Sequence, residues 1–250
     1  MPFITAGDPD LDFTATLLQK LDAAGCHLCE VGIPYSDPIA DGPVIQASYT
    51  RALGAGTKLD AILKMLKSTT AEIQMPVVTM ISFAIIYRIG LDDFLDKAID
   101  AGVAGAIVPD MPVDESAEFA KKCAARDFNL IQLVTPTTPR ERAIRIAENS
   151  SGFIYYVSIA GITGERTSLP DDLVENVSWL RKQTELPICV GFGISKPEHA
   201  EVLKPVADGL IVGSAIVRQI ATIEDGTSKE EAARNVESFC GEMLAAIGST

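Results

Sequence analysis

Residues 187–217 read PICVGFGISKPEHAEVLKPVADGLIVGSAIV, and this stretch contains the unit from which the rest of the chain is built. An apolar run, Pro187–Val190, leads into a glycine-rich turn. A helical stretch, Pro197–Val202, follows, and Ala-Asp-Gly at 207–209 precedes the next apolar run, Leu210–Val212, which again ends in glycine. This order predicts two parallel strands joined by a helix.

The same unit recurs along the whole chain. Six further apolar runs predict strands, at Pro2–Thr5, Leu28–Gly32, Pro76–Ile81, Gly105–Val108, Leu130–Val134 and Phe153–Val157. Apolar residues at helical spacing predict helices at Leu11–Ala24, Leu59–Lys67, Leu91–Ala101, Ser116–Arg126, Arg140–Asn149, Val174–Gln183 and Lys229–Ala246. Eight strands alternating with helices predict an α/β fold, a (β/α)8 TIM barrel, with residues 1–250 as a single domain. An open doubly wound sheet is the alternative, although the first strand lacks a glycine-rich nucleotide turn.

The composition limits the classes of partner. The chain carries 21 Lys and Arg against 34 Asp and Glu, a net charge of −13, and its basic residues are scattered. Nucleic acids and anionic membranes are therefore not expected as partners, because both are bound through clustered Lys and Arg. The uncharged stretch Met75–Tyr87 is too short to span a membrane and predicts a buried strand with its following loop. Without a visible signal peptide or disulfide framework, we expect a cytoplasmic protein.

Metal ligands and catalytic histidines find little support in the sequence. Cys26-His27-Leu28-Cys29 is a lone Cys-x-x-Cys pair, and no second pair follows at a zinc-like spacing. We expect no metal site and interpret the two cysteines as small buried residues beside a strand. The positions of His27 and His199 predict structural roles for both.

Two glycine-rich turns follow the last two predicted strands. Gly193 lies in the first turn, and Gly213 and Ser214 lie in the second. Small residues let backbone N–H groups approach an anion, and a short helix beginning near Ser214 directs its positive end at the same point. Phosphate sites of TIM barrels often follow these two strands, so we expect a phosphate site here. Tight packing at two turns is the alternative.

A carboxylate interrupts the second predicted strand. Glu30 stands between Cys29 and Val31, and strand alternation directs its side chain opposite to theirs, into the barrel mouth. Burial there raises a carboxyl pKa, which suits a group that gives and takes a proton near neutrality. A salt-bridged Glu30 is the alternative, but we expect no Lys or Arg on a neighbouring strand end. The stiff loop that follows is able to hold Asp41 over the same pocket.

The sixth predicted strand carries two adjacent tyrosines, Tyr155 and Tyr156, which point in opposite directions. One of them must face the barrel interior, and its hydroxyl needs a partner there. The following segment, 158–166, contains two glycines and is long enough to act as a lid.

These residues resemble the tryptophan synthase alpha-chain family. The similar segments run in order along nearly the whole chain, at Phe3–Pro9, Glu30–Pro43, Val108–Pro112, Tyr155–Gly164, Gly191–Ser195 and Gly213–Val217. The loop from the glutamate to the aspartate and the Ser-x-x-Gly-x-Thr-Gly lid are very specific, whereas other phosphate-binding barrels share the glycine turns. The resemblance implies a carbon–carbon lyase that splits indole-3-glycerol phosphate into indole and glyceraldehyde 3-phosphate by a retro-aldol reaction.

The resemblance also implies roles for the site residues. Glu30 would protonate indole C3 and then accept the proton of the glycerol C3′ hydroxyl. Asp41 would accept a hydrogen bond from the indole N–H, and Tyr155 would orient Glu30 or the glycerol chain. The substrate-binding residues would be Phe3 and Ile107 on the indole, Thr163 in the lid against Asp41, and Gly164, Gly193, Gly213 and Ser214 on the phosphate.

The implied partner is the tryptophan synthase beta chain. That chain carries pyridoxal phosphate and would receive indole for L-tryptophan synthesis in an α2β2 assembly, whereas no cofactor is implied for the present chain. The loop around Asp37 and Pro38 and the loop after the third strand would form the contact.

The sequence departs from the family pattern at three places. Ser82, Ala84 and Ile85 occupy the end of the third strand, where the family usually has an aromatic residue followed by Asn and Pro. Ile159 stands where the lid often has Arg, and the chain begins almost at the first strand, without the family's additional N-terminal helix. Two alternatives therefore stay open. One is a catalytically weakened alpha chain that acts as an allosteric partner of beta, and the other is another phosphate-binding barrel enzyme of the same pathway.

Overall fold

Eight parallel strands pair in sequence order in this computed structural model, which describes residues 1–38, 41–158, 172–191 and 193–248. Their bounds are β1 Phe3–Thr5, β2 Cys29–Gly32, β3 Val77–Met80, β4 Gly105–Ile107, β5 Asn129–Val134, β6 Ile154–Val157, β7 Ile188–Gly191 and β8 Gly209–Leu210. The ring closes beyond β8, where the Phe3 N–H donates to the Val212 carbonyl at 2.9 Å and the Val212 N–H donates to the Met1 carbonyl at 3.0 Å. The predicted barrel is confirmed, and the open doubly wound sheet is wrong.

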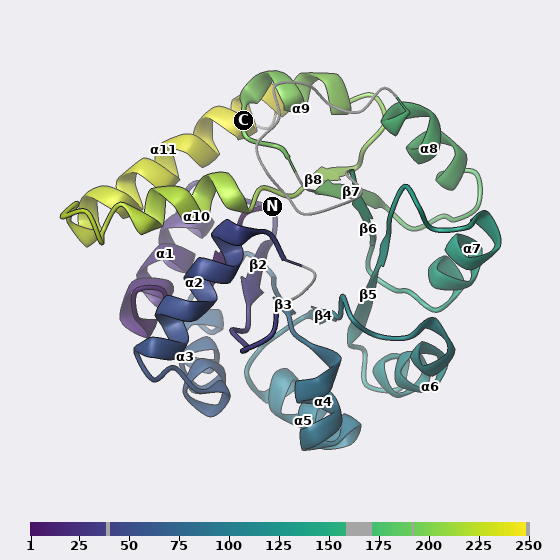
Figure 1. Cartoon of the computed structure of the whole chain (residues 1–250), viewed down its shortest axis with the longest axis horizontal. Coiled ribbons are helices and arrows are strands. Elements are labelled where there is room, and N and C mark those ends of the chain that lie inside the picture. The colour runs from purple at the N-terminus through teal and green to yellow at the C-terminus, as the bar shows by residue number, and fades with distance from the viewer. Residues whose placement is uncertain (39–40, 159–171, 192, 249–250) are drawn as a thin grey trace.

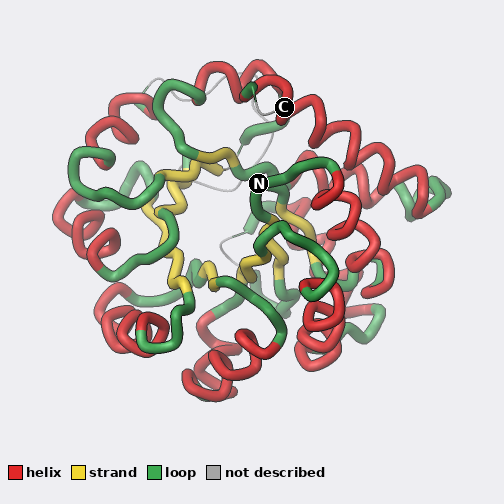
Figure 2. Tube along the Cα trace, turned by 180° about the vertical axis from the view of Figure 1, so that it is seen from behind, coloured by secondary structure: helices red, strands yellow, loops and turns green. Residues whose placement is uncertain are grey.

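Helices surround the strands on the outside of the ring (Figure 1), and the view from behind shows the strands enclosed by them (Figure 2). Their bounds are α1 Leu11–Ala23, α2 Pro43–Gly54, α3 Leu59–Thr70, α4 Phe83–Ile89, α5 Leu91–Asp100, α6 Val113–Ala124, α7 Arg140–Glu148, α8 Leu173–Leu180, α9 Pro197–Leu203, α10 Ser214–Ala221 and α11 Lys229–Ile247. Within the described ranges, no helix is both long and apolar enough to cross a membrane.

Strand alternation divides the buried side chains into two clusters. Cys29 and Val31 of β2 and Tyr156 of β6 pack in the layer between the strands and the helices. Phe3 and Tyr155 belong to a second cluster that fills the barrel interior. Strands of such a barrel are buried on both faces, which is why they read as nearly continuous apolar runs in the sequence. A polar side chain within one of these runs is therefore an exception that needs an explanation.

Two helices occupy segments for which the sequence predicted no helix. The loop predicted after the third strand is wrong, because α4 begins at Phe83. Ser82 caps this helix, since its Oγ accepts from the Ala84 N–H at 3.2 Å and donates to Asp110 Oδ2 at 2.6 Å. The Phe83 N–H donates to Asp110 Oδ1 at 2.7 Å. Asp110, from the segment after β4, thus helps to start a helix that the apolar run alone did not predict.

Helix α2 was also missed, although its sequence carries a signal. Pro43 stands at its first turn, a position that favours a helix start, and Ile45, Tyr49 and Ala52 form a buried stripe at helical spacing. The short helix predicted near Ser214 is confirmed as α10.

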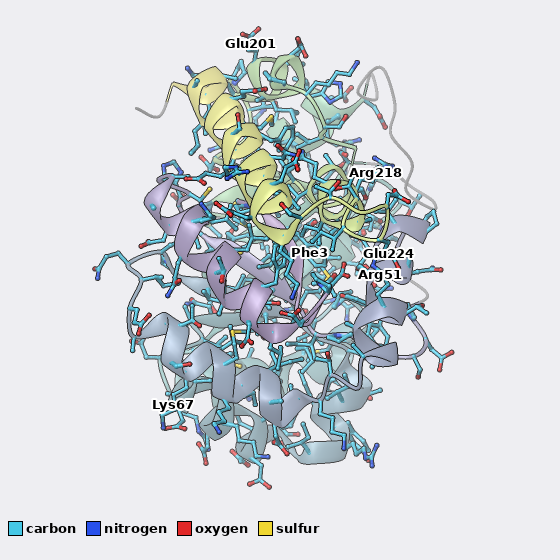
Figure 3. All side chains as sticks on the ribbon, turned by 90° about the vertical axis from the view of Figure 1, so that its left-hand side faces the viewer. Phe3, Arg51, Lys67, Glu201, Arg218 and Glu224 are labelled. Atoms are coloured by element: carbon cyan, nitrogen blue, oxygen red, sulfur yellow. The ribbon has the colours of Figure 1, made fainter. Side chains whose placement is uncertain are left out.

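A buried ion pair joins the segments around the mouth of the barrel. Asp8, which follows β1 and is 2% exposed, accepts two hydrogen bonds at 2.8 Å from the Arg51 guanidinium of α2. The same guanidinium lies 3.3 Å from Glu224, which follows α10. Figure 3 labels both Arg51 and Glu224, with their side chains close together between the ends of α2 and α10. One cation thus ties β1, α2 and α10 together.

We expect Arg51→Ala to lower the free energy of unfolding by about 3 kcal/mol or more, because it leaves the Asp8 carboxylate buried without its partner. Urea unfolding curves measure this change. The control is Lys67→Ala, which removes the ion pair of a 59% exposed side chain with Asp100 and should change the free energy by about 0.5 kcal/mol or less. Equal losses in the two variants would contradict a special role for Arg51.

Candidate active site

A cavity opens at the carboxyl ends of the strands, where the active sites of TIM barrels lie. Its volume is about 600 Å³ with the solvent at its mouth included, which is the size of a small-molecule site. The lining residues come from β1, β2, β3 and β6, from α2 and from the segments after β7 and β8. They are Phe3, Glu30, Asp41, Gly42, Ile45, Met80, Tyr155, Gly193, Ile194, Ser195, Ile211, Gly213, Ser214 and Ala215.

Most of the predicted site residues meet in this cavity. All three predicted catalytic residues line it, as do Phe3, Gly193, Gly213 and Ser214. Ile107 does not line it and is fully buried in the interior cluster, whereas Met80, its partner in the β3–β4 register, reaches the cavity. Thr163 and Gly164 lie outside the described residues, and so does Ile159.

Glu30 lies in the wall of the cavity, in the middle of β2. Its side chain is fully buried, and neither carboxylate oxygen has a hydrogen-bond partner within the described part of the chain. The alternative of a salt-bridged Glu30 is therefore not supported. Burial raises the pKa of Glu30 to about 8, and the charge of Asp41 adds to the effect. The carboxyl thus holds its proton at neutral pH and is able to release it.

Asp41 also lines the cavity and stands just before α2. Burial, with a further contribution from the charge of Asp110, raises the pKa of Asp41 to about 6. The Asp41 N–H donates to the Pro38 carbonyl at 3.1 Å. The Gln46 side-chain amide donates to the Asp41 carbonyl at 2.8 Å and to the Pro38 carbonyl at 3.2 Å. Gln46 therefore fixes the segment that carries Asp41, a role that the sequence did not indicate because α2 was not predicted.

Tyr155 is the tyrosine of β6 that faces the interior, as the alternation predicted for one of the pair. Burial raises its pKa well above the ordinary range, and the charges of Glu30 and Asp41 act in the same direction. The hydroxyl is therefore neutral and able to donate. Gly191 of the neighbouring β7 makes room for it, since a Cβ at this position would lie 2.5 Å from the Tyr155 hydroxyl oxygen.

The glycine turns form the third part of the site. Gly193 has a φ of 78°, which favours glycine, and the Ser195 N–H donates to Nδ1 of His199 at 3.4 Å. His199 is buried and thus has the structural role predicted for it. Gly213 caps α10, whose first N–H groups have no partners within the helix. In the described part of the chain, no Lys or Arg lines the cavity, so an anion here would be held by N–H groups.

This arrangement suits acid–base chemistry on a small phosphorylated molecule. Two carboxyl groups with different raised pKa values face one cavity, which is how proteins separate an acid from a base near neutrality. Apolar side chains supply the rest of the wall. In the ranges that the structure describes, no group of three or more His, Cys, Asp or Glu is arranged to hold a metal ion. All five cysteines are free and buried, Cys26 and Cys29 among them.

Comparisons with known proteins agree with this description. The sequence model of the family described as tryptophan synthase alpha chain matches residues 1–248. The tryptophan synthase alpha chain of Rhodopirellula baltica is 56% identical over 256 residues, covering 99% of this chain and 92% of the relative. That of Trichormus variabilis is 47% identical over 248 residues, with 99% and 92% covered. The structure of the tryptophan synthase alpha subunit from Pyrococcus furiosus superposes with a TM-score of 0.88 at 37% identity, covering 98% of this chain and 96% of that one.

We expect the free energy of unfolding to fall as the pH rises from about 5 to about 8, because the folded state raises the pKa of Glu30 from 4.5 to about 8 and therefore favours its protonated form. The contribution is fully present below the ordinary pKa and is lost as the pH passes 8. Glu30→Gln should reduce this fall by on the order of 3 kcal/mol. Urea unfolding at several pH values measures the pH dependence of the free energy of unfolding, and Glu201→Gln, at an exposed position, is the control. Parallel curves for Glu30→Gln and the unsubstituted chain would contradict the raised pKa.

Proposed function

The chain belongs to the tryptophan synthase alpha-chain family, and from this premise we propose that it cleaves indole-3-glycerol phosphate into indole and glyceraldehyde 3-phosphate. One observation carries the proposal. Glu30, fully buried and without a partner in the described residues, faces the same cavity as Asp41 and the first turn of α10. The family match over residues 1–248 does not favour another phosphate-binding barrel enzyme or a merely regulatory alpha chain.

Glu30 supplies and then recovers the proton of the reaction. With a pKa of about 8 it is protonated at neutral pH, and it donates this proton to C3 of the indole ring. The protonated ring is an electron-poor indolenine, so the bond from C3 to the glycerol chain becomes able to break. The Glu30 carboxylate then accepts the proton of the C3′ hydroxyl as that bond breaks and the aldehyde forms. The proton count balances, and Glu30 returns to its initial state.

Asp41 acts on the other side of the ring. With a pKa of about 6 it is mostly ionised at neutral pH, and its carboxylate accepts a hydrogen bond from the indole N–H. This bond strengthens as the ring gains positive charge, which makes the stabilisation larger in the transition state than in the ground state. Tyr155, whose neutral hydroxyl is able to donate, orients Glu30 or the glycerol chain.

The remaining wall of the cavity binds the two ends of the substrate. Phe3, Ile45 and Met80 offer apolar surface to the indole ring, and Ile107 supports them from within the interior cluster. The turn at Gly193 and the first N–H groups of α10, at Gly213 and Ser214, bind the phosphate. Thr163 and Gly164, in a segment outside the described residues, close over the site in this proposal.

The proposed partner is a tryptophan synthase beta chain in an α2β2 complex. Pyridoxal phosphate belongs to that partner, and this chain requires no cofactor of its own for the lyase step. The solved tryptophan synthase complex from Pyrococcus furiosus contains a chain that superposes on this one with a TM-score of 0.88 at 35% identity. The proposed contact includes Asp37 and the segment after β3, where Tyr87 of α4 is 75% exposed. We infer a cytoplasmic location, as expected for such a biosynthetic enzyme.

Glu30→Gln should lower kcat for indole release by about 10²–10⁴-fold, since a positioned acid or base contributes a factor of this size. Asp41→Asn should also lose most of the activity. In the unsubstituted chain, the rate should fall above pH 8, as Glu30 loses its proton, and below pH 6, as Asp41 gains one. An indole-release assay on indole-3-glycerol phosphate measures these effects. The exposed Glu201→Gln is the control, and a Glu30→Gln variant with more than a tenth of the original kcat would exclude Glu30 as the acid.

We expect a complex when the chain is mixed with a tryptophan synthase beta chain, together with a faster lyase reaction. Sedimentation detects the complex, and the same indole-release assay detects the change in rate. Tyr87→Asp should weaken the complex, because it places a charge on the exposed face of α4. A complex without any lyase activity would indicate the weakened alpha chain instead. No complex and an unchanged lyase rate would indicate an enzyme that acts alone.

A further inference from the structure

Tyr49 of α2 is a buried polar residue that the mechanism above does not use. Its side chain is 1% exposed and belongs to the interior cluster together with Phe3 and Tyr155. It does not line the cavity. Its ring packs against that of Tyr35, with the centroids 5.7 Å apart and an interplanar angle of 52°. The phenol ring is therefore held in place, and its hydroxyl has a defined position.

The Tyr49 hydroxyl lies over β2 at Gly32. A Cβ on Gly32 would come within 2.8 Å of the hydroxyl oxygen and within 2.6 Å of the Phe3 ring, so this glycine leaves the space that the two side chains fill. Gly32 follows Glu30 by two residues on the same strand, and residues two apart face the same side at a distance of about 6.6 Å. A glutamate side chain is long enough to reach from its own position toward a hydroxyl above the next one.

Both groups lack partners in the described part of the chain. The two carboxylate oxygens of Glu30 and the hydroxyl of Tyr49 are buried and make no hydrogen bond there. A buried polar group without a partner is destabilising. The Glu30 carboxylate and the hydroxyl above Gly32, two residues further along β2, therefore favour a contact with each other. Burial and the charges of Asp41 and Glu30 raise the pKa of Tyr49 well above its ordinary range. The hydroxyl thus stays protonated and is able to donate.

We propose that Tyr49 is a positioning residue whose hydroxyl donates a hydrogen bond to the Glu30 carboxylate after Glu30 has released its proton. The bond holds the carboxylate in the orientation needed to accept the next proton. This inference rests on the proposed function, because it assigns Tyr49 a place in the cycle of Glu30. It explains why a phenol hydroxyl lies beside the Phe3 ring in the space above Gly32.

Other charged and titratable groups around Glu30 also affect its pKa or respond to its charge. The Asp41 carboxyl raises the pKa of Glu30, and the amino group of Met1 lowers it, both by less than burial does. The charge of Glu30 in turn raises the pKa of the Tyr155 hydroxyl on β6 and the pKa of the Cys29 thiol. The neighbours of Glu30 in the strand register, Phe3 and Val78, are apolar.

Tyr49→Phe keeps the ring and removes only the hydroxyl. We expect the pKa of Glu30 to rise by about one unit, because its charged form loses a donor, and kcat for indole release to fall about tenfold with KM little changed. The pKa is read from the carboxyl ¹³C signal of Glu30, which Glu30→Gln identifies by removing it. Tyr156→Phe is the matched control, since Tyr156 is equally buried but packs outside the ring, and it should leave both quantities unchanged.

A second experiment separates positioning from packing. In the Glu30→Gln background, Tyr49→Phe should lower the residual rate no further, because there is no carboxylate left to orient. The same tenfold loss in that background, or an unchanged Glu30 titration in Tyr49→Phe, would overturn the inference. A shifted titration in a protein whose Glu30→Gln variant keeps its activity would support the contact and overturn the proposed function instead.

Discussion

The closure of the strand ring is the constraint on which the rest of the structure depends. The hydrogen bonds of Phe3 and Met1 with Val212 join the first and last strands, and all eight strands then run in the same direction around one axis. Their carboxyl ends consequently meet at one mouth. Glu30 of β2, Tyr155 of β6 and the first turn of α10 are far apart in sequence, yet closure makes them the walls of one cavity. An open sheet with the same strands would leave β2 and α10 at different places.

Closure also creates an interior in which an ionised carboxyl group is energetically unfavourable. Glu30 is fully buried there, so its charged form is disfavoured and its pKa rises to about 8. A cation beside Glu30 would remove this cost, but it would also return the carboxyl to its ionised form at neutral pH. The Arg51 cation that ties β1 to α2 is instead paired with Asp8 and Glu224. The ion pair stabilises the mouth while Glu30 keeps its proton.

The sequence predicted the fold well, because closed barrels repeat one strand–helix unit and bury each strand on both faces. It also indicated Glu30, since strand alternation determines which side of a strand a residue faces. For the pair Tyr155 and Tyr156, alternation predicted only that one of the two faces the interior. Gln46 and Tyr49 were missed, because the hydrogen bonds of Gln46 and the position of the Tyr49 hydroxyl above Gly32 arise only once α2 is packed against the barrel. The sequence predicted that Ile107 contacts the substrate, whereas its register partner Met80 lines the cavity. This difference depends on how far the cavity extends along the paired strands β3 and β4. These contacts depend on how separate segments pack together, which the hydrophobic pattern of each single segment does not determine.

A net charge of −13 disfavours binding of anions unless the protein holds them by groups other than Lys and Arg. A phosphate is usually bound by Lys or Arg, yet in the described part of the chain none lines the cavity. A cation placed there for the phosphate would share one small cavity with Glu30 and Asp41, and it would lower both pKa values. The field of a helix N-terminus falls off within its first turn, so the N–H groups after Gly213 would act mainly on an anion bound directly against them. In the proposed phosphate site, binding by backbone groups would leave the described wall of the cavity without a cation that lowers the pKa of Glu30.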